Sequence, residues 1–373
     1  MKRFGILQTA FPARGTRSPA GASYVPRVTW RLLHSAGRRH GLQVLFFRAE
    51  DVDFHENKVH AWSSTSSDGM SAWTRQWHPL PDVVYENYPM DPKAVRARAK
   101  RVKRTFAGLG VPVFNPVFFN KADLQTILSH EPSIAQYLPK GRVAGTRADV
   151  TSFLKEHRTA YLKPIDGYQG RGIIEVRLLN GNRVRVKSDK FRGGRSLLRK
   201  CSLSKFQSFA GRLLKKRRYL IQQGLDLLKK GERKIDFRVV LHRGADGKWQ
   251  CVGIRPKLGR PGSMVTNSHA GGSKTTWEKL ERWARRTHTP LPSAAELQTP
   301  ALLAAEHLTR YRPTLSHMGV DVGVDSPRGI YLLDFNVVPG RDLLTSDMLR
   351  RATDLTAGFA AHLAGSRRQH SPR

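Results

Sequence analysis

The chain has 373 residues, of which 39% are hydrophobic, and its 65 lysines and arginines against 29 aspartates and glutamates give a net charge of +36. This length allows two or three domains, and no run approaches the roughly 18 uninterrupted apolar residues that would predict a transmembrane helix. Two cysteines far apart in sequence, Cys201 and Cys251, argue against a disulfide framework or a cysteine-ligated zinc site and are typical of the reducing cytoplasm.

Residues 1–114 predict a small α/β domain. The chain opens with basic residues, but the apolar segment that follows is short and indicates a strand rather than a signal peptide. The order of the predicted elements favours a partly parallel sheet. Strands are predicted at residues 3–9, 42–47, 57–62, 72–77, 81–86 and 111–116, and helices at 24–40 and 92–109.

The rest of the chain predicts two further α+β regions. The first has predicted helices at 121–130, 146–157 and 204–217, strands at 160–165, 173–179 and 219–223, and hairpins within 181–200. The second has predicted strands at 234–243 and 249–257, helices at 276–287 and 301–311, a hairpin over 320–337 and a helix over 343–364. The last residues, GSRRQHSPR, predict a disordered tail.

The hairpin at 320–337 carries the most informative polar residues. Asp334 and Asn336 stand two positions apart in an apolar strand, so their side chains share one face. Asp321 lies 13 residues upstream on a matching strand, across a turn-like SPRG segment, and a hairpin would bring it beside Asp334. Carboxylate and amide oxygens are ligands of Mg²⁺, usually together with phosphate and water. The pattern therefore predicts a metal–nucleotide site.

Lys163 is central in a short apolar strand that leads into a loop with Gly167, Gly170 and Gly172. A buried cation needs an anionic partner, and glycine backbone can approach phosphate closely. These residues predict a clamp on the phosphates of ATP. The alternative is an exposed lysine on an edge strand followed by an ordinary hairpin turn.

A third group is cationic. Asp236 and Arg238 form another i, i+2 pair on a predicted strand, Arg255 lies on the next strand, and Asn267 stands in the loop before Gly271. Arginine suits bidentate binding of phosphate or carboxylate. The alternative for the Asp236–Arg238 pair is an ion pair on the protein surface, which contributes little to stability.

Several of these segments occur in the order found in the ATP-grasp superfamily, and the chain resembles its YheC/YheD-type, endospore coat-associated group. The resemblance covers roughly residues 115–357. It implies an ATP-grasp fold of two α+β lobes, about 115–222 and 223–357, after an α/β domain at 1–114 and before a helix end and basic tail at 358–373. The resemblance is carried by NKADLQTIL (120–128), YLKPIDGYQGRGI (161–173), YLIQQGLDL (219–227), DFRVVL (236–241), the run 254–272, and VDVGVD…YLLDFNVVPG (320–340).

The resemblance also implies roles for individual residues. The implied phosphate contacts are Lys121, Lys163 and the loop glycines Gly167, Gly170 and Gly172, and the implied adenine hinge is Gln222, Gln223 and Leu225. The implied Mg²⁺ ligands are Asp321, Asp334 and Asn336. The residues implied to face the γ-phosphate and the acyl group are Arg255, Asn267 and Arg238. Gln223 and Asp334 both stand where many relatives have glutamate.

The implied activity is an ATP- and Mg²⁺-dependent ligase that joins a carboxylate to an amine or another nucleophile through an acyl phosphate. An acidic peptide or polymer is one candidate substrate. The expected location is the cytoplasm, with association with the spore coat as the alternative. Two other functions stay open: a non-catalytic nucleotide-binding coat or scaffold protein, and a polyanion-binding protein.

Three basic segments are relevant to the polyanion alternative. Residues 96–104 hold six cations in nine positions, residues 212–218 hold five in seven, and residues 183–200 add eight. Such segments attract polyanions, although each can also be a solvated face. Few aromatic residues interrupt them, so they offer little base stacking and argue against nucleic acid as a specific partner.

Overall fold

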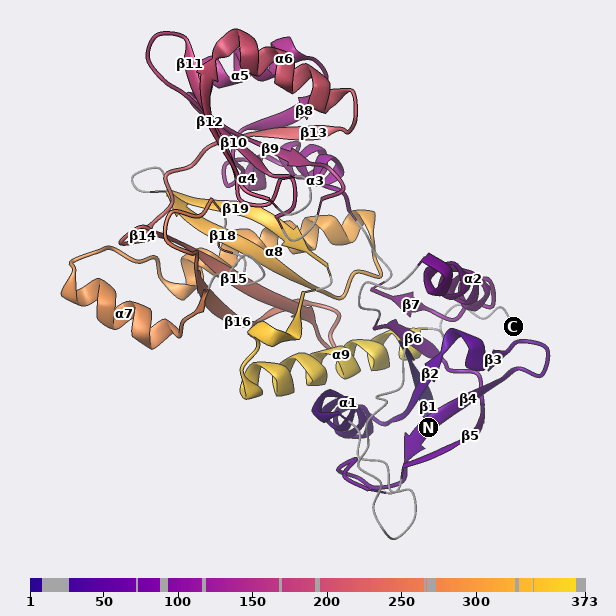
Figure 1. Ribbon diagram of the computed structural model, residues 1–373. Helices are drawn as coiled ribbons and strands as arrows, with labels where there is room; N and C mark the ends of the chain where they lie inside the picture. Colours follow the sequence, from indigo (N-terminus) through magenta and orange to yellow (C-terminus); the bar gives the residue numbers. More distant parts are fainter. Residues whose placement is uncertain are drawn as a thin grey trace.

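Three β-sheets form the framework of the computed structural model (Figure 1). The structure describes residues 1–8, 27–71, 73–87, 93–115, 119–167, 170–191, 195–264, 266, 273–325, 329–337 and 339–366. Among the helices in these residues, none is both long and apolar enough to cross a bilayer.

The N-terminal sheet has the strand order β3-β4-β2-β1-β6-β7, with β5 paired to β4. Strands β2, β1, β6 and β7 run parallel, so the predicted partly parallel sheet is confirmed. Helices α1 and α9 cover one face, and α2 covers the other. The bounds are β1 Lys2–Gln8, α1 Val28–Arg39, β2 Leu42–Arg48, β3 Val52–Asp53, β4 Lys58–Ser64, β5 Trp73–Pro79, β6 Val83–Glu86, α2 Lys93–Gly108 and β7 Val113–Phe114.

The middle sheet is antiparallel and has the order β12-β11-β10-β9-β13-β8. Helices α5 and α6 cover the face that carries its apolar core, and its other face is turned toward the C-terminal sheet (Figure 1). The bounds are β8 Gly141–Ala144, α5 Arg147–His157, β9 Thr159–Pro164, β10 Ile174–Leu178, β11 Arg183–Ser188, β12 Leu197–Ser202, α6 Leu203–Leu214 and β13 Tyr219–Gln223.

The C-terminal sheet is also antiparallel, with the order β17-β16-β15-β18-β19 and β14 paired to β15. Helices α3, α4, α7 and α8 share its main apolar core, while α9 packs against β15 and β16 on the other face. The bounds are α3 Lys121–Ser129, α4 Pro132–Ala135, β14 Lys229–Lys230, β15 Arg233–Arg243, β16 Trp249–Leu258, β17 Ser273–Lys274, α7 Trp277–Arg286, α8 Ala294–Tyr311, β18 His317–Asp325, β19 Gly329–Asn336 and α9 Ser346–Ser366.

Helix α8 begins seven residues earlier than predicted. Ser293 caps it by accepting a hydrogen bond from the Glu296 amide, and the Glu296 carboxylate accepts one from the Ser293 amide. This capping box stabilises the first turn. Pro300 lies inside the helix and is buried, so the predicted helix start at residue 301 is wrong.

The N-terminal and C-terminal sheets are joined by a buried polar contact. Asn115 adopts a positive φ of 58° just after β7. Its side-chain amide donates to the Val337 carbonyl at 2.9 Å and lies 2.9 Å from His317 Nε2, and its oxygen accepts from the Ser316 amide at 3.2 Å. These bonds fix the N-terminal domain to the end of the hairpin that carries the candidate site.

Candidate functional site

The predicted hairpin is confirmed, and its register brings the two aspartates together. Strands β18 and β19 pair so that Asp321 lies directly opposite Asp334, and Gly319 lies opposite Asn336. The register shifts between Asp321 and Val322, which marks a β-bulge immediately beside the pair. Bulges often re-aim side chains beside functional sites.

Asp321 is buried and held by two cations. Its carboxylate accepts hydrogen bonds from Arg238 at 2.5 and 3.0 Å, and Lys257 Nζ lies 2.9 Å away. Burial acts to raise the pKa of Asp321, but the positive charges of Arg238 and Lys257 hold that pKa well below its usual range. Asp321 is therefore a permanent anion.

Asp334 is more open and has a different partner. Lys121, the first residue of α3, places its Nζ 2.5 Å from Asp334 Oδ1, and 46% of the Asp334 side chain is exposed. Burial acts to raise the pKa of Asp334, but Lys121 and Lys163 hold it below the ordinary value. An ionised carboxylate next to two lysines is thus available at the cleft surface.

A row of charged residues crosses four strands of the C-terminal sheet. Arg255 on β16 is paired with Arg238 on β15, which is paired with Asp321 on β18, and Asp321 faces Asp334 on β19. Directly paired residues of antiparallel strands project from the same face. The arginines therefore flank the carboxylates where an anionic substrate would meet them.

The Asp236–Arg238 pair is not a surface ion pair. Asp236 is only 5% exposed and Arg238 only 7% exposed. Arg238 binds Asp321, while Asp236 lies 3.0 Å from Lys257 Nζ and accepts a hydrogen bond from the Thr266 hydroxyl. Burial raises the pKa of Asp236, against the effect of Lys257.

Lys163 lies on β9, an interior strand of the middle sheet between β10 and β13, so the edge-strand alternative is wrong. Its Nζ donates to the Leu333 carbonyl of β19 at 3.2 Å. Burial lowers the pKa of Lys163 to about 8, although Asp334 acts to raise it. The lysine of the middle sheet thus reaches the β18–β19 hairpin of the C-terminal sheet.

A pocket between these two sheets collects the predicted nucleotide residues. Lys121, Lys163, Asp334, Gln125 and Gln222 supply its polar side chains. Its remaining lining consists of Leu124, Leu128, Leu138, Leu220, Leu332, Leu333 and Phe335. A pocket lined by both lysines and leucines suits a ligand with an anionic part and an apolar part.

The glycine loop follows the end of β9, and the predicted hinge begins at the end of β13. Gly167 donates its amide to the Pro164 carbonyl at 3.1 Å, and Gly170 and Gly172 both have a φ of 73°, a conformation that favours glycine. Gln222 is buried in the pocket wall, the Gln223 amide bonds the Lys140 carbonyl at 2.8 Å, and Leu225 follows as a half-buried residue.

The oxygens of Asp334 and Asn336 fit a magnesium ion only in part. They supply one carboxylate and one amide, which suits Mg²⁺ when phosphate oxygens and water complete its coordination. Within the described residues no group of three or more His, Cys, Asp or Glu side chains could hold a metal. Asp321 would have to exchange one of its cations for the metal. Asn267 lies outside the described residues.

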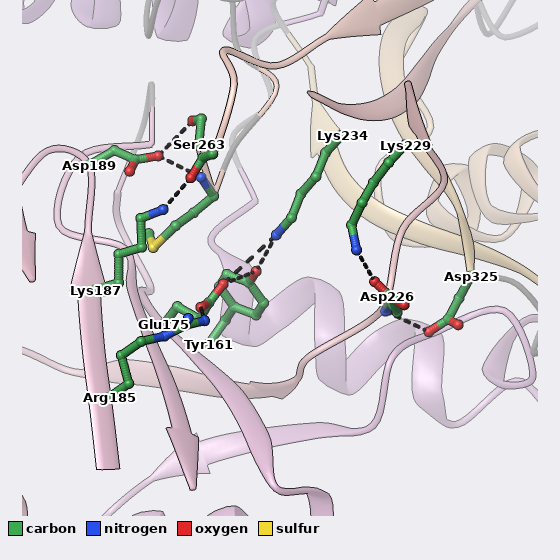
Figure 2. Close-up of polar contacts among 12 residues, drawn as sticks. Tyr161, Glu175, Arg185, Lys187, Asp189, Asp226, Lys229, Lys234, Ser263 and Asp325 are labelled. Atoms are coloured by element: carbon green, nitrogen blue, oxygen red, sulfur yellow. Dashed lines mark hydrogen bonds and ion pairs between the residues drawn. The ribbon is translucent and has the colours of Figure 1, made fainter. Parts of the chain in front are cut away.

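Sequence reasoning missed Lys257 and a second polar cluster. Lys257 stands two positions after Arg255, so the period of a strand could have placed both on one face. The second cluster is centred on Glu175, which accepts from Tyr161 at 2.7 Å and from Arg185 at 3.1 Å, and Lys234 donates to the Tyr161 hydroxyl at 2.9 Å (Figure 2). It links the middle sheet to β15 of the C-terminal sheet.

The arrangement of two antiparallel sheets around this pocket is the ATP-grasp fold. A solved structure of the ATP-grasp ligase PsnB, complexed with minimal precursor, superposes with a TM-score of 0.51 at 13% identity, covering 94% of this chain and 98% of that one. Such a low identity supports the fold alone.

The chain belongs to the family described as YheC/D like ATP-grasp, which matches residues 110–363. It is 25% identical over 306 residues to the endospore coat-associated protein YheD of Bacillus subtilis (strain 168), covering 79% of this chain and 66% of YheD. It is 23% identical over 313 residues to YheC of the same organism, covering 80% of this chain and 81% of YheC. The alignment spans less than two thirds of YheD's own length.

Proposed function

We propose that the protein is an ATP-dependent ligase that activates a carboxylate as an acyl phosphate and transfers the acyl group to an amine or a related nucleophile. The observation that carries this proposal is the convergence of Lys163 and Lys121 on Asp334 in a pocket between two sheets. Family membership supports the same reading, because the matching family is an ATP-grasp family.

In this proposal the nucleotide lies in the pocket between the sheets. Lys121 and Lys163 bind its phosphates, and Gly167, Gly170 and Gly172 allow the backbone to approach them closely. The ring lies against the leucines of the pocket and the segment from Gln222 to Leu225. Lys163 gains an anionic partner, which offsets the cost of burying its charge.

Magnesium completes the proposed site. Asp334 and Asn336 would hold the ion, with Asp321 as a third ligand if it exchanges one of its cations. A bound Mg²⁺ neutralises charge on the phosphoryl group as it transfers. Arg238 and Arg255 add fixed positive charge in the same row of the sheet, and Asn267 keeps its proposed role toward the γ-phosphate and the acyl group.

The reaction then needs little covalent help from the protein. A carboxylate oxygen of the substrate attacks the γ-phosphorus, the bond to the β-phosphate oxygen breaks, and ADP leaves. The amine attacks the acyl carbon, phosphate departs with the bonding electrons, and the amine loses a proton. Positioning and electrostatics are the main contributions of the protein to such transfers.

Three finer statements belong to the same proposal. The first is that the chain divides into an N-terminal domain at 1–114 and two ATP-grasp lobes at about 115–222 and 223–357. The substrate includes a carboxylate and a nucleophile, with an acidic peptide or polymer as the candidate class. The coat association of YheD and YheC suggests the spore coat as a place of action beside the cytoplasm.

The test is ADP release in the presence of Mg-ATP, mixed carboxylates and amines, with mass spectrometry of the adducts. Turnover should need both substrates, and Lys163→Ala and Asp334→Ala should each reduce it by at least about 10²-fold, as expected for lost transition-state contacts. A variant of the exposed Asp347, Asp347→Ala, serves as the control. Full turnover in both site variants would contradict the residue assignment.

A non-catalytic nucleotide-binding protein is the second candidate. The observation that favours it is the full pairing of Asp321 with Arg238 and Lys257, which leaves one carboxylate for a metal. Calorimetry separates the two, because Mg-ATP binding without ADP release under any substrate mixture supports the second candidate.

A further inference from the structure

One face of the middle sheet continues beyond the nucleotide pocket as an open, basic surface. Strand residues alternate between faces, and Val184, Val186 and Ile174 belong to the core under α5 and α6. The opposite face carries Lys163 and Tyr161 on β9, and its continuation over β10, β11 and β12 lies toward the C-terminal sheet (Figure 1).

Register assigns five cations to this continuation. Glu175 is paired with both Tyr161 and Lys187, Arg177 with Arg185, Arg185 with Lys200, and Arg183 with Ser202. Directly paired residues share a face. We call this surface the basic face; it consists of Arg177, Arg183, Arg185, Lys187 and Lys200, around Glu175.

The half of the basic face nearest the C-terminal sheet is already engaged. Arg185 binds Glu175 at 3.1 Å, and Lys187 donates to the Gly262 carbonyl. Figure 2 shows Arg185 and Lys187, both on β11, with Arg185 beside Glu175 and Lys187 near the segment of Ser263. The two cations of this half therefore already have hydrogen-bond partners within the protein.

The outer half is unbalanced. Arg177, Arg183 and Lys200 are exposed. Across the residues that the structure describes, none of these three has a carboxylate within 4.0 Å. Leu198, paired with Lys187 on the same face, is 69% exposed and adds an apolar contact. Three unpaired cations on one rigid sheet surface create a positive potential that attracts polyanions.

We infer that the basic face binds an acidic polypeptide whose reactive carboxylate reaches the pocket at Lys163; this inference rests on the proposed ligase function. Lys200 lies three strands from β9, and the row that contains it meets β9 at Thr159, four residues before Lys163. With strands about 4.8 Å apart and about 3.3 Å per residue, the two lysines are about 20 Å apart. An extended peptide covers that distance with about six residues.

A polycarboxylate suits this surface better than a nucleic acid does. Among the described residues of the face, the aromatic side chain is Tyr161, and its hydroxyl is bound to Glu175 and Lys234. Exposed stacking platforms, on which single strands depend, are therefore missing from the described part of the face. A peptide of glutamates or aspartates also presents the functional group that the proposed reaction consumes.

The experiment measures direct binding by fluorescence anisotropy, using fluorescein-labelled oligoglutamates of three, six and twelve residues. Affinity is expected to rise steeply between three and six residues and to fall with added salt, because exposed charges are screened. The double variant Arg183→Glu/Lys200→Glu should bind the twelve-residue peptide at least about tenfold more weakly, which is about 1.4 kcal/mol.

The matched control is Lys215→Glu/Lys216→Glu. These exposed lysines follow α6, on the side of the sheet opposite the basic face, and the change in net charge is the same. The control should change affinity less than about twofold, since it alters only long-range charge. The neutral double variant Arg183→Gln/Lys200→Gln, with an unchanged melting temperature, separates lost contacts from repulsion or misfolding.

Equal losses in both charge-reversal variants would overturn the inference, because binding would then follow net charge rather than this face. Stronger binding of a fluorescein-labelled dT12 oligonucleotide than of the twelve-residue oligoglutamate would also overturn it. Binding needs no turnover, so oligoglutamate bound at this face without ADP release would count against the ligase while supporting the face. ADP release with small carboxylates, without any oligoglutamate binding, would support the ligase and contradict the basic face as a peptide-binding surface.

Discussion

The affinity for Mg-ATP is expected to fall about tenfold between about pH 7 and about pH 9, because Lys163 loses its proton in that range. Its pKa of about 8 in the nucleotide-free protein lies below the ordinary 10.5, since burial disfavours the charge. About nine tenths of the molecules carry the proton at pH 7 and about one tenth at pH 9. Phosphate anions raise this pKa again, so binding takes up a proton above pH 8.

The folding stability of the protein changes with pH in the opposite direction to its nucleotide affinity. A lysine whose folded pKa is lowered costs the folded protein stability while it is charged, by about 3 kcal/mol for the shift from 10.5 to about 8. The cost is fully present below pH 8 and disappears as pH rises from about 8 to about 10.5. Deprotonation of Lys163 should therefore increase the free energy of unfolding of the nucleotide-free protein in this pH range. Over the same range the affinity for Mg-ATP falls.

Titration calorimetry at about pH 9 in two buffers of different ionisation enthalpy counts the protons taken up. The expected uptake is about 0.9 per nucleotide bound. In Lys163→Arg the guanidinium does not titrate, so both the uptake and the pH dependence should vanish. A flat wild-type profile, or an equal slope in Lys163→Arg, would refute the reasoning.

Two further predictions concern stability and are measured by urea denaturation. Asp321→Ala leaves the buried Arg238 without its carboxylate and leaves Lys257 with Asp236 alone, so it should cost about 3–5 kcal/mol, whereas Asp347→Ala, which removes an exposed ion pair, should cost less than about 1 kcal/mol. Equal effects would contradict the burial argument. Gly224→Ala should cost about 1–3 kcal/mol, because a Cβ there would lie 2.8 Å from Thr159 Cβ. The control, Gly108→Ala, places a Cβ with nothing within 4 Å and should be neutral or stabilising. A neutral effect of Gly224→Ala would show that the backbone around Gly224 relaxes to accept the methyl group.

The candidate hairpin could be predicted because its information is local. Two apolar strands separated by a short segment had to bring Asp321 close to Asp334, but alternation alone would pair Asp321 with Leu333. The β-bulge between Asp321 and Val322, which the sequence pattern did not predict, places the two aspartates directly opposite each other. The family resemblance then supplied the chemistry. Lys163 was predictable for a similar reason, since a charge inside an apolar strand needs an anionic partner.

The partners of these charges could not be predicted from pattern alone. Lys121 and Asp334 are 213 positions apart, and their contact depends on how α3 packs beside the C-terminal sheet. Arg238 has an aspartate two positions away, yet it binds one 83 positions away because strand pairing places it there. Local spacing identified the charged residues, while tertiary packing chose their partners.

Helix α9 makes the core of the N-terminal domain depend on a segment that is synthesised well after that domain. Its Phe359 meets Phe114 edge-on at 5.5 Å, and Ala357 and Ala360 complete the core that Trp30 begins. A growing polypeptide therefore exposes this apolar surface until α9 has left the ribosome. The N-terminal domain can therefore reach its native core only after the region between it and α9 has been translated, so its apolar surface needs protection during that interval.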